Sequence, residues 1–265
     1  LIGALRYALL SGGKRIRAFL VFESAKLFSC PYHATGVVAT SVEMVHCYSL
    51  IHDDLPAMDD DDLRRGIPTL HKAYDEPTAI LVGDALQSLA FEILSQNVQH
   101  LDDKVQLKLI CTLARSIGTN AMVGGQFIDI EAEKNKQSLK IDELKRLQSM
   151  KTGALISFCC QSALIMGQAS NAQSKALQAY ASDIGLAYQM SDDLLDATSL
   201  TAILGKKAGK DESRGKATFV RLLGVEQAIR TLDHLVDQAI DHLKIFDERA
   251  NHLRSFALFI KTRKK

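Results

Sequence analysis

The sequence predicts an all-α fold, and two observations support this prediction. All four prolines lie before residue 78, and runs of alternating β-branched residues are scarce along the chain, so helix is the expected state throughout. The chain has 265 residues, of which 47% are hydrophobic. This length and composition suit one large domain or two small ones with a substantial buried core.

The candidate helices have boundaries placed to within about 2–4 residues. In chain order they cover residues 1–11, 15–29, 34–54, 78–98, 104–122, 141–167, 171–197, 217–243 and 247–262. A break in the long 141–167 segment is allowed near Gly153. The segments expected to be loops, and therefore candidates for function, are 55–77, 123–140 and 198–216.

Overall charge and cysteine content exclude several classes of function. The net charge is only +1, so we expect no general attraction to nucleic acid, and any electrostatic function must come from local clusters. The five cysteines include no C-x-x-C pair, which indicates neither a disulfide framework nor a zinc site. A reducing, cytoplasmic location fits best.

Membrane insertion and secretion are not expected. The most apolar stretch, "ALISFCCQSALIMG" at 154–167, is too short to cross a bilayer and contains polar residues, so it is interpreted as a buried helix. The chain opens with "LIGALRYALLSGGKRIR", in which the cations follow the apolar residues, the wrong order for a signal peptide. Because no initiator methionine is present, we expect that part of the native N-terminus is missing.

Familiar nucleotide and calcium motifs are absent from the sequence. No two glycines stand at G-x-G spacing, and "GGKR" lacks the remaining residues of a phosphate-binding P-loop. Alignment of an EF-hand loop on Gly66 places Leu63, Arg65 and Lys72 at ligand positions, which rules it out.

The stretch "HDDLPAMDDDDLRRG" at 52–66 holds six aspartates beside two arginines. The preceding "SVEMVHCYSLIH" has helical apolar spacing that places His46 and either Ser49 or Leu50 on one stripe with Asp53. Asp53 is therefore expected to end a helix on a largely buried side, where a carboxylate needs a partner. Because Pro56 interrupts the helix, Asp59 can turn back toward Asp53, and the two could share a cation. A plain solvated acidic loop is the alternative.

A second acidic segment lies in "YQMSDDLLD" at 188–196. Its polar residues follow helical spacing and are Gln189, Asp192, Asp193 and Asp196. Like charges one turn apart destabilise a helix, so this face suggests a compensating cation. Oxygen ligands without imidazole or thiolate point to Mg²⁺, or to Mn²⁺, both of which commonly bridge to phosphate oxygens.

Basic residues gather at four places that could hold a second polyanion. They are Lys14, Arg15 and Arg17 after "SGG"; Arg64 and Arg65; Lys151 in "MKTGAL"; and Lys206, Lys207, Lys210 and Lys216. Arginine binds phosphate with two parallel hydrogen bonds and lysine supplies a point charge. Each alone is also an ordinary surface charge.

Seven motifs together resemble the short-chain trans-isoprenyl diphosphate synthases, and most closely the bacterial farnesyl diphosphate synthases. They are "GGKRIR", "HCYSLIHDDLPAMDDDDLRRG", "GDALQ", "GGQFID", "KTGALI", "YQMSDDLLD" and "GKD…GKAT", which stand in the family's order across essentially all 265 residues. The resemblance implies a single polyprenyl synthetase domain over residues 1–265. It further implies an isoprenoid-synthase-type bundle of about ten helices around a deep central pocket, usually as a homodimer.

The resemblance also implies a role for individual residues. A cluster of three Mg²⁺ ions is expected on Asp53, Asp59, Asp192 and Asp196, with Asp54 and Asp193 in support. The allylic diphosphate is expected at Arg64, Lys151, Thr152, Gln189, Lys206 and Lys216. Isopentenyl diphosphate is expected at Lys14, Arg17, His46 and Arg65.

The implied chemistry is ionisation of the allylic diphosphate, attack by the isopentenyl double bond and loss of a proton. Lys151, Thr152 and Gln189 are the expected catalytic residues, the last two as oxygen dipoles near the carbocation. Water must be excluded, so 198–216 and the C-terminal "KTRKK" are candidate lids.

Tyr48 is the expected ruler for product length. It lies five residues before Asp53, about 7.5 Å along a helix, and in the family an aromatic residue there accompanies a fifteen-carbon product. Farnesyl diphosphate is favoured, and geranylgeranyl diphosphate is the alternative. A terpene cyclase and a non-catalytic partner subunit are less favoured, because both acidic motifs and the second set of cations are present.

Departures from the family pattern are few. Ala18 stands where proline is common, "TFV" at 218–220 replaces "TYP", and Ser191 occupies a position where glutamine is frequent. None of them removes an expected ligand.

Overall fold

The computed structural model describes residues 1–96, 101–135, 139–198 and 217–263. Its α-helices are α1 (Ile2–Leu10), α2 (Ile16–Leu27), α3 (Tyr32–Asp53), α4 (Leu70–Ala73), α5 (Glu76–Ser95), α6 (Asp103–Ile117), α7 (Met122–Lys134), α8 (Ile141–Gln148), α9 (Ala154–Met166), α10 (Asn171–Thr198), α13 (Phe219–Leu223), α14 (Val225–His242) and α15 (Asn251–Thr262). The other elements are the π-helix η1 (Ser149–Gly153), the 3₁₀ turns η2 (Leu243–Ile245) and η3 (Glu248–Ala250), and the strands β1 (Leu63–Arg64) and β2 (Ile67–Pro68).

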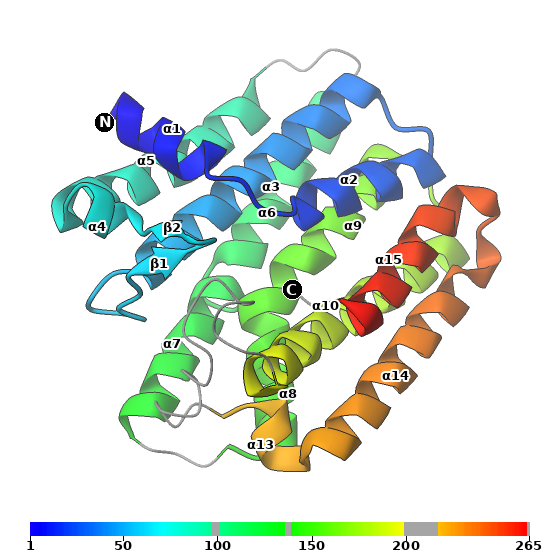
Figure 1. The fold of residues 1–265 in the computed structure, drawn as a ribbon. Helices are drawn as coiled ribbons and strands as arrows, with labels where there is room; N and C mark the ends of the chain where they lie inside the picture. Colours follow the sequence, from blue (N-terminus) through cyan, green and yellow to red (C-terminus); the bar gives the residue numbers. More distant parts are fainter. Residues whose placement is uncertain (97–100, 136–138, 199–216, 264–265) are drawn as a thin grey trace.

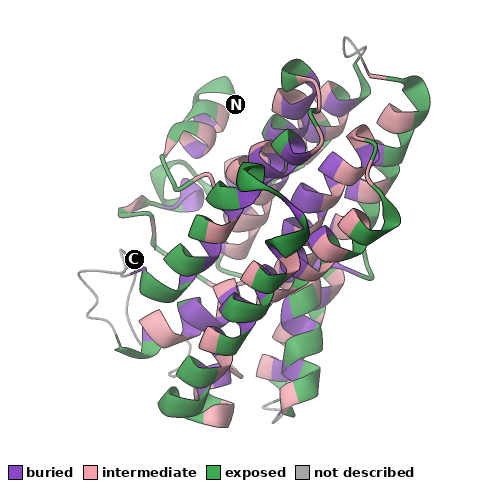
Figure 2. Ribbon diagram, turned by 90° about the vertical axis from the view of Figure 1, so that its right-hand side faces the viewer, coloured by how far each residue is buried: buried purple, intermediate pink, exposed green. Residues whose placement is uncertain are grey.

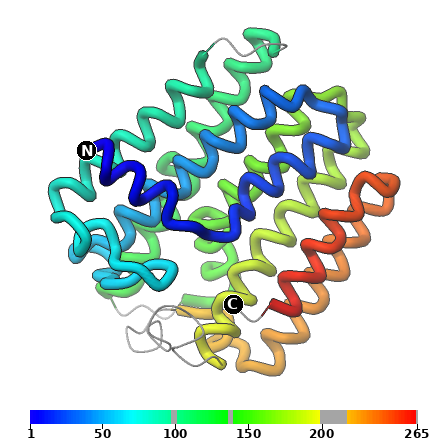
Figure 3. The backbone as a smooth tube through the Cα atoms, turned by 45° about the horizontal axis from the view of Figure 1, so that its top comes forward, coloured from blue at the N-terminus to red at the C-terminus, as the bar shows by residue number. Residues whose placement is uncertain are grey.

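The long helices pack around one hydrophobic core that runs from Ala4 in α1 to Ile260 in α15. Figure 1 shows α3 and α10 running in the same general direction, so that their C-terminal ends, which carry the two acidic segments, lie toward the same end of the bundle. The tube in Figure 3 shows the same arrangement from above. Buried residues line the inner helix faces and exposed residues the outer ones (Figure 2). The predicted all-α fold is confirmed.

Two predicted loops contain secondary structure. The segment 123–140, expected to be a loop, contains most of α7, and 55–77 contains the β1–β2 hairpin and α4. The loop prediction at α7 was wrong because the glycine pair weakens helical propensity, whereas here the glycines serve packing. A Cβ on Gly125 would lie 2.4 Å from the backbone nitrogen of Lys151, and one on Gly124 would lie 1.8 Å from the carbonyl oxygen of Thr119.

The expected break near Gly153 takes the form of η1, a π-helical segment over Ser149–Gly153. Such segments occur frequently at functional sites because they redirect side chains within an otherwise regular helix. Gly153 also lies close to α10, since a Cβ on Gly185 would meet its Cα at 3.1 Å. Further along, Gly224, with φ of 77°, ends α13 and begins α14 within the segment expected as one helix.

By length and composition alone, α3 and α5 each reach what a membrane span requires. The apolar window of α3 is 61% buried inside the molecule and that of α5 is 33% buried. Buried core helices meet the same criterion, so these two helices are weak indicators of a membrane span.

Candidate active site

The first aspartate motif (residues 53–62) begins where α3 ends. Beyond Asp53 the chain turns back on itself, and the Asp59 backbone N–H donates to the Asp53 carbonyl oxygen at 2.7 Å. The Asp61 N–H likewise donates to the Asp54 carbonyl oxygen at 3.2 Å, and Asp60 has a positive φ of 44°. The return of Asp59 toward Asp53, which the position of Pro56 predicts, is therefore present in the structure.

The Asp53 carboxyl is buried beside charges of both signs. Its pKa is raised to about 6, mainly by burial, while Lys151 and Arg64 lower it and Asp59 and Asp54 raise it. Carboxylates crowded in this way gain from a bound cation. The donors are oxygen atoms alone, which fits Mg²⁺.

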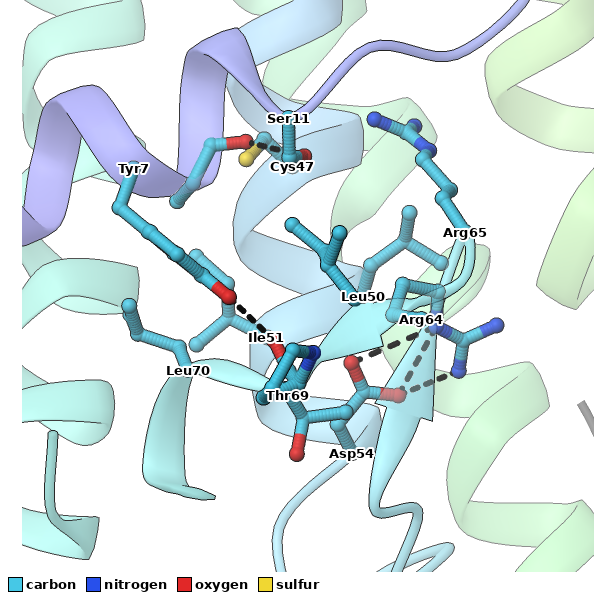
Figure 4. Close-up of a pocket in the computed structure, with 13 residues that line it drawn as sticks. Tyr7, Ser11, Cys47, Leu50, Ile51, Asp54, Arg64, Arg65, Thr69 and Leu70 are labelled. Atoms are coloured by element: carbon cyan, nitrogen blue, oxygen red, sulfur yellow. Dashed lines mark hydrogen bonds and ion pairs between the residues drawn. The ribbon is translucent and has the colours of Figure 1, made fainter. Parts of the chain in front are cut away.

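Asp54, the residue that follows α3, is paired with Arg64. It is only 3% exposed, and Arg64 Nε donates to its Oδ1 at 3.0 Å while Nη2 makes a second, shorter contact with the same oxygen. Figure 4 shows this pair beside a small cavity of about 40 Å³ among α1, α3 and the hairpin. Asp54 therefore fixes Arg64, which matches a supporting role better than a direct ligand role.

Arg65 is held by the glycines before α2. It has a positive φ of 56°, points away from Asp54 in Figure 4, and donates through Nη1 to the Gly12 carbonyl oxygen at 2.5 Å. A Cβ on Gly13 would stand 2.6 Å from the Arg65 Cζ atom. The glycines of "GGKRIR" thus make room for an arginine that comes from another part of the chain.

His46 lies among four arginines, which we call the cation cluster: Arg15, Arg17, Arg64 and Arg65. Burial lowers the pKa of His46 well below its ordinary value, and all four guanidinium groups lower it further. His46 is therefore neutral near pH 7 and can donate or accept a hydrogen bond without adding charge. The Nε atom of Arg17 is buried and has no hydrogen-bond partner among the described residues. These are features of a site that accepts an anion.

Two further residues lie near the cation cluster: Glu43, which sequence reasoning missed, and Lys14, which it predicted. Glu43 accepts hydrogen bonds from Arg15 Nη1 at 3.2 Å and from the Ala18 backbone N–H at 3.0 Å, so it orients the start of α2. Lys14 lies with its Nζ 5.8 Å from the centre of the Phe259 ring in α15. No sequence motif marks Glu43, because its partners are 25 or more residues away.

The π-helix η1 connects the two acidic motifs. The Lys151 ammonium is close enough to Asp53 to lower the pKa of that carboxyl, and it pairs with Asp129 of α7 at 2.6 Å. The next residue, Thr152, donates through Oγ1 to Gln189 Oε1 of α10 at 3.3 Å. Two adjacent residues of η1 therefore face different motifs: Lys151 lies near the first, and Thr152 contacts the second.

Asp129 was not among the predicted site residues. It belongs to the "GGQFID" segment, which was noticed only as part of the resemblance. The close approach that Gly125 permits between α7 and η1 brings its carboxylate to Lys151. A carboxylate four residues after a glycine pair was the available signal.

The second aspartate motif (residues 188–196) is held by several separate elements. Gln189 Nε2 donates to Asp193 Oδ1 at 3.0 Å, and Asp193 Oδ2 accepts the Phe219 backbone N–H at 2.8 Å. Asp192 accepts a hydrogen bond from Arg263 Nη2 at 2.6 Å. Asp193 and Asp196 are 4% and 9% exposed, so their carboxylates lie mainly inside the protein.

The aspartates do not form a finished metal centre by themselves. Within the described residues, no three His, Cys, Asp or Glu side chains converge as a metal-binding group. The predicted ligands are instead divided between α10 and the end of α3 with the turn that follows it. A Mg²⁺ cluster there would need further ligand oxygens, which the phosphates of a substrate and water can supply.

Tyr48 is 6% exposed and lies one to two turns before Asp53 on α3. Its hydroxyl receives a hydrogen bond from Gln87 Nε2 of α5 at 3.4 Å, and its ring meets the His52 ring edge to face at 5.8 Å. A Cβ on Gly83 would lie 2.0 Å from His52 Nε2. Close contact between α3 and α5 therefore fixes the Tyr48 ring.

Lys206 and Lys216, the remaining residues predicted to bind the allylic diphosphate, lie outside the described residues.

Comparison with known proteins identifies the family. The polyprenyl synthetase family model matches residues 1–252. Farnesyl diphosphate synthase from Escherichia coli is 44% identical over 94% of this chain and 83% of its own length. Geranylgeranyl diphosphate synthase from Cyanophora paradoxa is 40% identical over 98% of this chain and 86% of its own length.

A solved structure agrees with these sequence matches. The FPP/GFPP synthase from Zymomonas mobilis, in its apo form, is 47% identical, with a TM-score of 0.89 over 98% of this chain and 88% of its own. Prenyl synthases of this kind are generally metal-dependent. The chain therefore belongs to the polyprenyl synthetase family.

Proposed function

We propose that this protein is a Mg²⁺-dependent prenyltransferase that condenses isopentenyl diphosphate head to tail with dimethylallyl or geranyl diphosphate and makes farnesyl diphosphate. The observation that carries the proposal is the link through η1. Lys151, which is near enough to Asp53 to lower the pKa of that carboxyl, and Thr152, which donates to Gln189, are adjacent in η1, which supports the proposal that both acidic motifs line one site. The cation cluster at the end of α3 adds a second anion site.

The allylic diphosphate is proposed to lie between the two motifs. Asp53, Asp59, Asp192 and Asp196 would hold three Mg²⁺ ions, or Mn²⁺, which neutralise charge on the departing diphosphate. Arg64 and Lys151 contribute fixed positive charge from the protein side, each already held by a carboxylate, Asp54 and Asp129 respectively. Lys206 and Lys216 are proposed to complete the same grip.

Isopentenyl diphosphate is proposed to bind Lys14, Arg17, His46 and Arg65, at the side of the cation cluster away from the allylic diphosphate. Arg17 and Arg65 supply guanidinium donors, and neutral His46 supplies a hydrogen bond at the same place. A terpene cyclase needs no second diphosphate site, so this cluster favours the synthase. Both acidic motifs are intact, which argues against a non-catalytic partner subunit.

The carbocation is proposed to form beside Thr152 and Gln189. Thr152 Oγ1 donates its proton to Gln189 Oε1 at 3.3 Å, which leaves the hydroxyl lone pairs available to face a developing positive charge. Gln189 is fixed in turn by donating to Asp193. The side chains are therefore oriented before substrate arrives, and the released diphosphate can take the proton lost in the final step.

Product length is proposed to depend on Tyr48. The buried ring, fixed by Gln87 and His52, would block the path of a chain growing down α3. Farnesyl diphosphate is the product named for the Escherichia coli relative, whereas the Cyanophora paradoxa relative is named for the twenty-carbon product. Geranylgeranyl diphosphate is accordingly the second candidate.

We further propose that residues 1–265 form one domain, that the protein works as a cytoplasmic homodimer, and that it binds neither nucleic acid nor a bilayer stably. The continuous core from α1 to α15 supports the single domain. The low net charge of +1 supports the absence of nucleic-acid binding.

The test is incubation of the purified protein with Mg²⁺, isopentenyl diphosphate and geranyl diphosphate, followed by mass spectrometry of the products. A terminal fifteen-carbon diphosphate is expected, and Tyr48→Ala should extend it to twenty carbons or more. A twenty-carbon product from the unmodified protein would overturn the chain-length assignment alone. Unextended substrate in a folded protein that binds Mg²⁺ and diphosphate would overturn the synthase assignment.

A further inference from the structure

The end of the chain is locked onto the second aspartate motif through one arginine. Arg263, just after α15, donates through Nη2 to Asp192 Oδ1 at 2.6 Å and to the Tyr188 carbonyl oxygen at 3.0 Å. Its Nε donates to Ser191 Oγ at 2.8 Å, and its guanidinium lies 4.1 Å from the centre of the Tyr188 ring. Figure 1 shows the end of α15 beside α10, where these contacts occur.

The guanidinium has little freedom to leave this position. The Arg263 side chain is only 1% exposed, and its contacts are with Tyr188, Ser191 and Asp192 of α10. Ser191 accepts a hydrogen bond from Arg263 and donates one to the Ile260 carbonyl oxygen at 2.9 Å, so this hydroxyl ties α10 to the last turn of α15 and to the arginine after it. A buried guanidinium held by four contacts is a permanent part of the site, because removing its carboxylate partner would strand the charge.

Asp192, in contrast, is half exposed, with 48% of its side chain accessible. Its contact with Arg263 uses Oδ1, so the arginine sets the orientation of the carboxylate while Oδ2 points elsewhere. Outer-shell partners of metal-ligating carboxylates commonly act in this way, and their loss typically weakens metal binding by about 10–100-fold.

We propose that Arg263 is a positioning residue for the second aspartate motif, holding the Asp192 carboxylate in the orientation in which it accepts Mg²⁺. Ser191, which stands where glutamine is frequent in the family, is part of the same device because its hydroxyl accepts the Arg263 Nε–H. The inference rests on the proposed function, since it assumes that Asp192 is a metal ligand. It assigns Arg263 no contact with either diphosphate.

Two other roles for Arg263 lead to different results. A simple anchor for α15 would affect the stability of the metal-free protein but not its response to Mg²⁺. A stand-in cation that competes with Mg²⁺ for Asp192 would weaken metal binding in the unmodified protein, so its removal would tighten binding. The burial of the side chain argues against the second role, because a stand-in must withdraw when the metal arrives.

The experiment compares Arg263→Gln with Lys261→Gln in the full chain. Lys261 lies two residues earlier on α15 and pairs with Asp233 at 2.9 Å, so its loss removes the same charge without touching α10. Three quantities are measured: the Mg²⁺ concentration that gives half-maximal activity, KM for isopentenyl diphosphate, and the rise in Tm on adding Mg²⁺ with inorganic pyrophosphate.

The expected result for Arg263→Gln is a rise of about 10–100-fold in the half-maximal Mg²⁺ concentration and a smaller Mg²⁺-pyrophosphate shift in Tm. KM for isopentenyl diphosphate and all values for Lys261→Gln should stay within about 2-fold of the unmodified protein. Should Arg263→Gln fold poorly, Ser191→Ala removes one Arg263 contact together with the hydrogen bond to Ile260 and keeps the charge, and it should shift the Mg²⁺ dependence in the same direction by less.

Unchanged or tighter Mg²⁺ dependence in both Arg263→Gln and Ser191→Ala would overturn the positioning role. A shift in KM for isopentenyl diphosphate alone would also overturn it, because that pattern belongs to direct substrate binding. If the unmodified protein shows no Mg²⁺-pyrophosphate shift in Tm and no Mg²⁺-dependent activity, the proposed function itself has failed. The unmodified protein therefore separates the two failures.

Discussion

The two aspartate motifs are supported in different ways. In the first, partners come from the same stretch of chain: Arg64 lies 10 residues after Asp54, and the Asp59 N–H returns to Asp53. In the second, partners come from distant elements: Phe219 lies 26 residues from Asp193, and Arg263 lies 71 residues from Asp192. The first motif is built by a local turn, and the second depends on how the helices pack.

The charge balance of the two motifs differs as well. Burial is the main cause that raises the pKa of Asp53 to about 6, with Lys151 opposing it and Asp59 adding to it, so ionisation of this carboxyl is unfavourable in the protein alone. At the second motif, Arg263 and the Phe219 N–H already donate hydrogen bonds to the carboxylates of Asp192 and Asp193 respectively. The first motif therefore gains most from a cation, and the second is oriented before one arrives.

The largest effects on kcat and Tm are expected for Asp53→Asn and Asp192→Asn, one in each motif. Both should lower kcat by about 10²–10³-fold, since each removes a group that stabilises charge in the transition state. Their effects on the metal-free protein should have opposite signs. At pH 7.5 Asp53→Asn removes a carboxylate that costs stability when ionised and should raise Tm by a few degrees. Asp192→Asn strands the buried Arg263 and should lower Tm by about 10 °C.

Differential scanning calorimetry in EDTA measures this contrast, with steady-state kinetics alongside. Two shifts of the same sign would show that the motifs do not differ in charge balance. Adding Mg²⁺ with pyrophosphate should raise the Tm of the unmodified protein, and neither variant should respond fully.

The next effect in size concerns η1, which links the motifs. Asp129→Asn removes the carboxylate that holds Lys151 at 2.6 Å and should lower kcat by about 10-fold, because Lys151 would no longer be fixed beside the allylic diphosphate. Glu131→Gln is the matched control. Glu131 lies on the same helix and pairs only loosely with Lys134 at 3.8 Å.

Rapid-quench measurement of a single turnover reports the rate of the chemical step directly. Equal rates for Asp129→Asn and Glu131→Gln would show that Lys151 keeps its position without Asp129. A loss in both would point to general damage to α7.

The contrast between the motifs also explains what sequence could predict. Helical periodicity and Pro56 were enough to place Asp53, Asp59 and the turn between them, because those interactions are local. The spacing of residues 189–196 predicted a polar helix face but not its partners. Arg263, Phe219 and Asp129 each approach from another element, and only the packing of α7, α13 and α15 against the site brings them there.

The wrong loop prediction over 123–140 has the same origin. Local propensity disfavours two adjacent glycines in a helix, whereas packing requires them: a Cβ at Gly125 would collide with the backbone of Lys151. The resemblance supplied the site residues that periodicity could not, yet Asp129 and Glu43 were not among them, since no pattern assigned them a role.

A smaller effect is expected at the cation cluster from Gly13→Ala. Both Gly12 and Gly13 have positive φ, 85° and 109°, so alanine at either should cost about 1–2 kcal/mol of stability. Only at Gly13 would the new Cβ meet Arg65, 2.6 Å from its Cζ atom, whereas nothing lies within 4 Å at Gly12. KM for isopentenyl diphosphate should therefore rise several-fold in Gly13→Ala and stay unchanged in Gly12→Ala. Similar KM values in the two variants would contradict the assignment of Arg65 to the isopentenyl diphosphate site.

The smallest effect is the pH dependence of stability in the metal-free protein. His46, beside the cation cluster, and Asp53, in the first motif, change this stability in opposite directions as the pH falls. Burial and four arginines lower the pKa of His46, so the unfolded chain binds a proton near pH 6.5 that the folded chain does not, and His46 reduces stability as pH falls below that value. The pKa of Asp53 is raised to about 6, so the folded chain binds the extra proton, and Asp53 adds stability as pH falls from about 6 toward 4.

Replacing either residue should reveal the pH dependence of stability that the other residue contributes. In EDTA, His46→Asn should flatten the loss of Tm between pH 6.5 and 5, and Asp53→Asn should steepen it, because the opposing gain has gone. Thermal unfolding at several pH values between 4.5 and 8 measures both slopes. Parallel curves for the two variants would mean that neither group changes its proton binding on folding, and that the charge imbalance at the first motif is carried by Asp59 and its neighbours instead of Asp53.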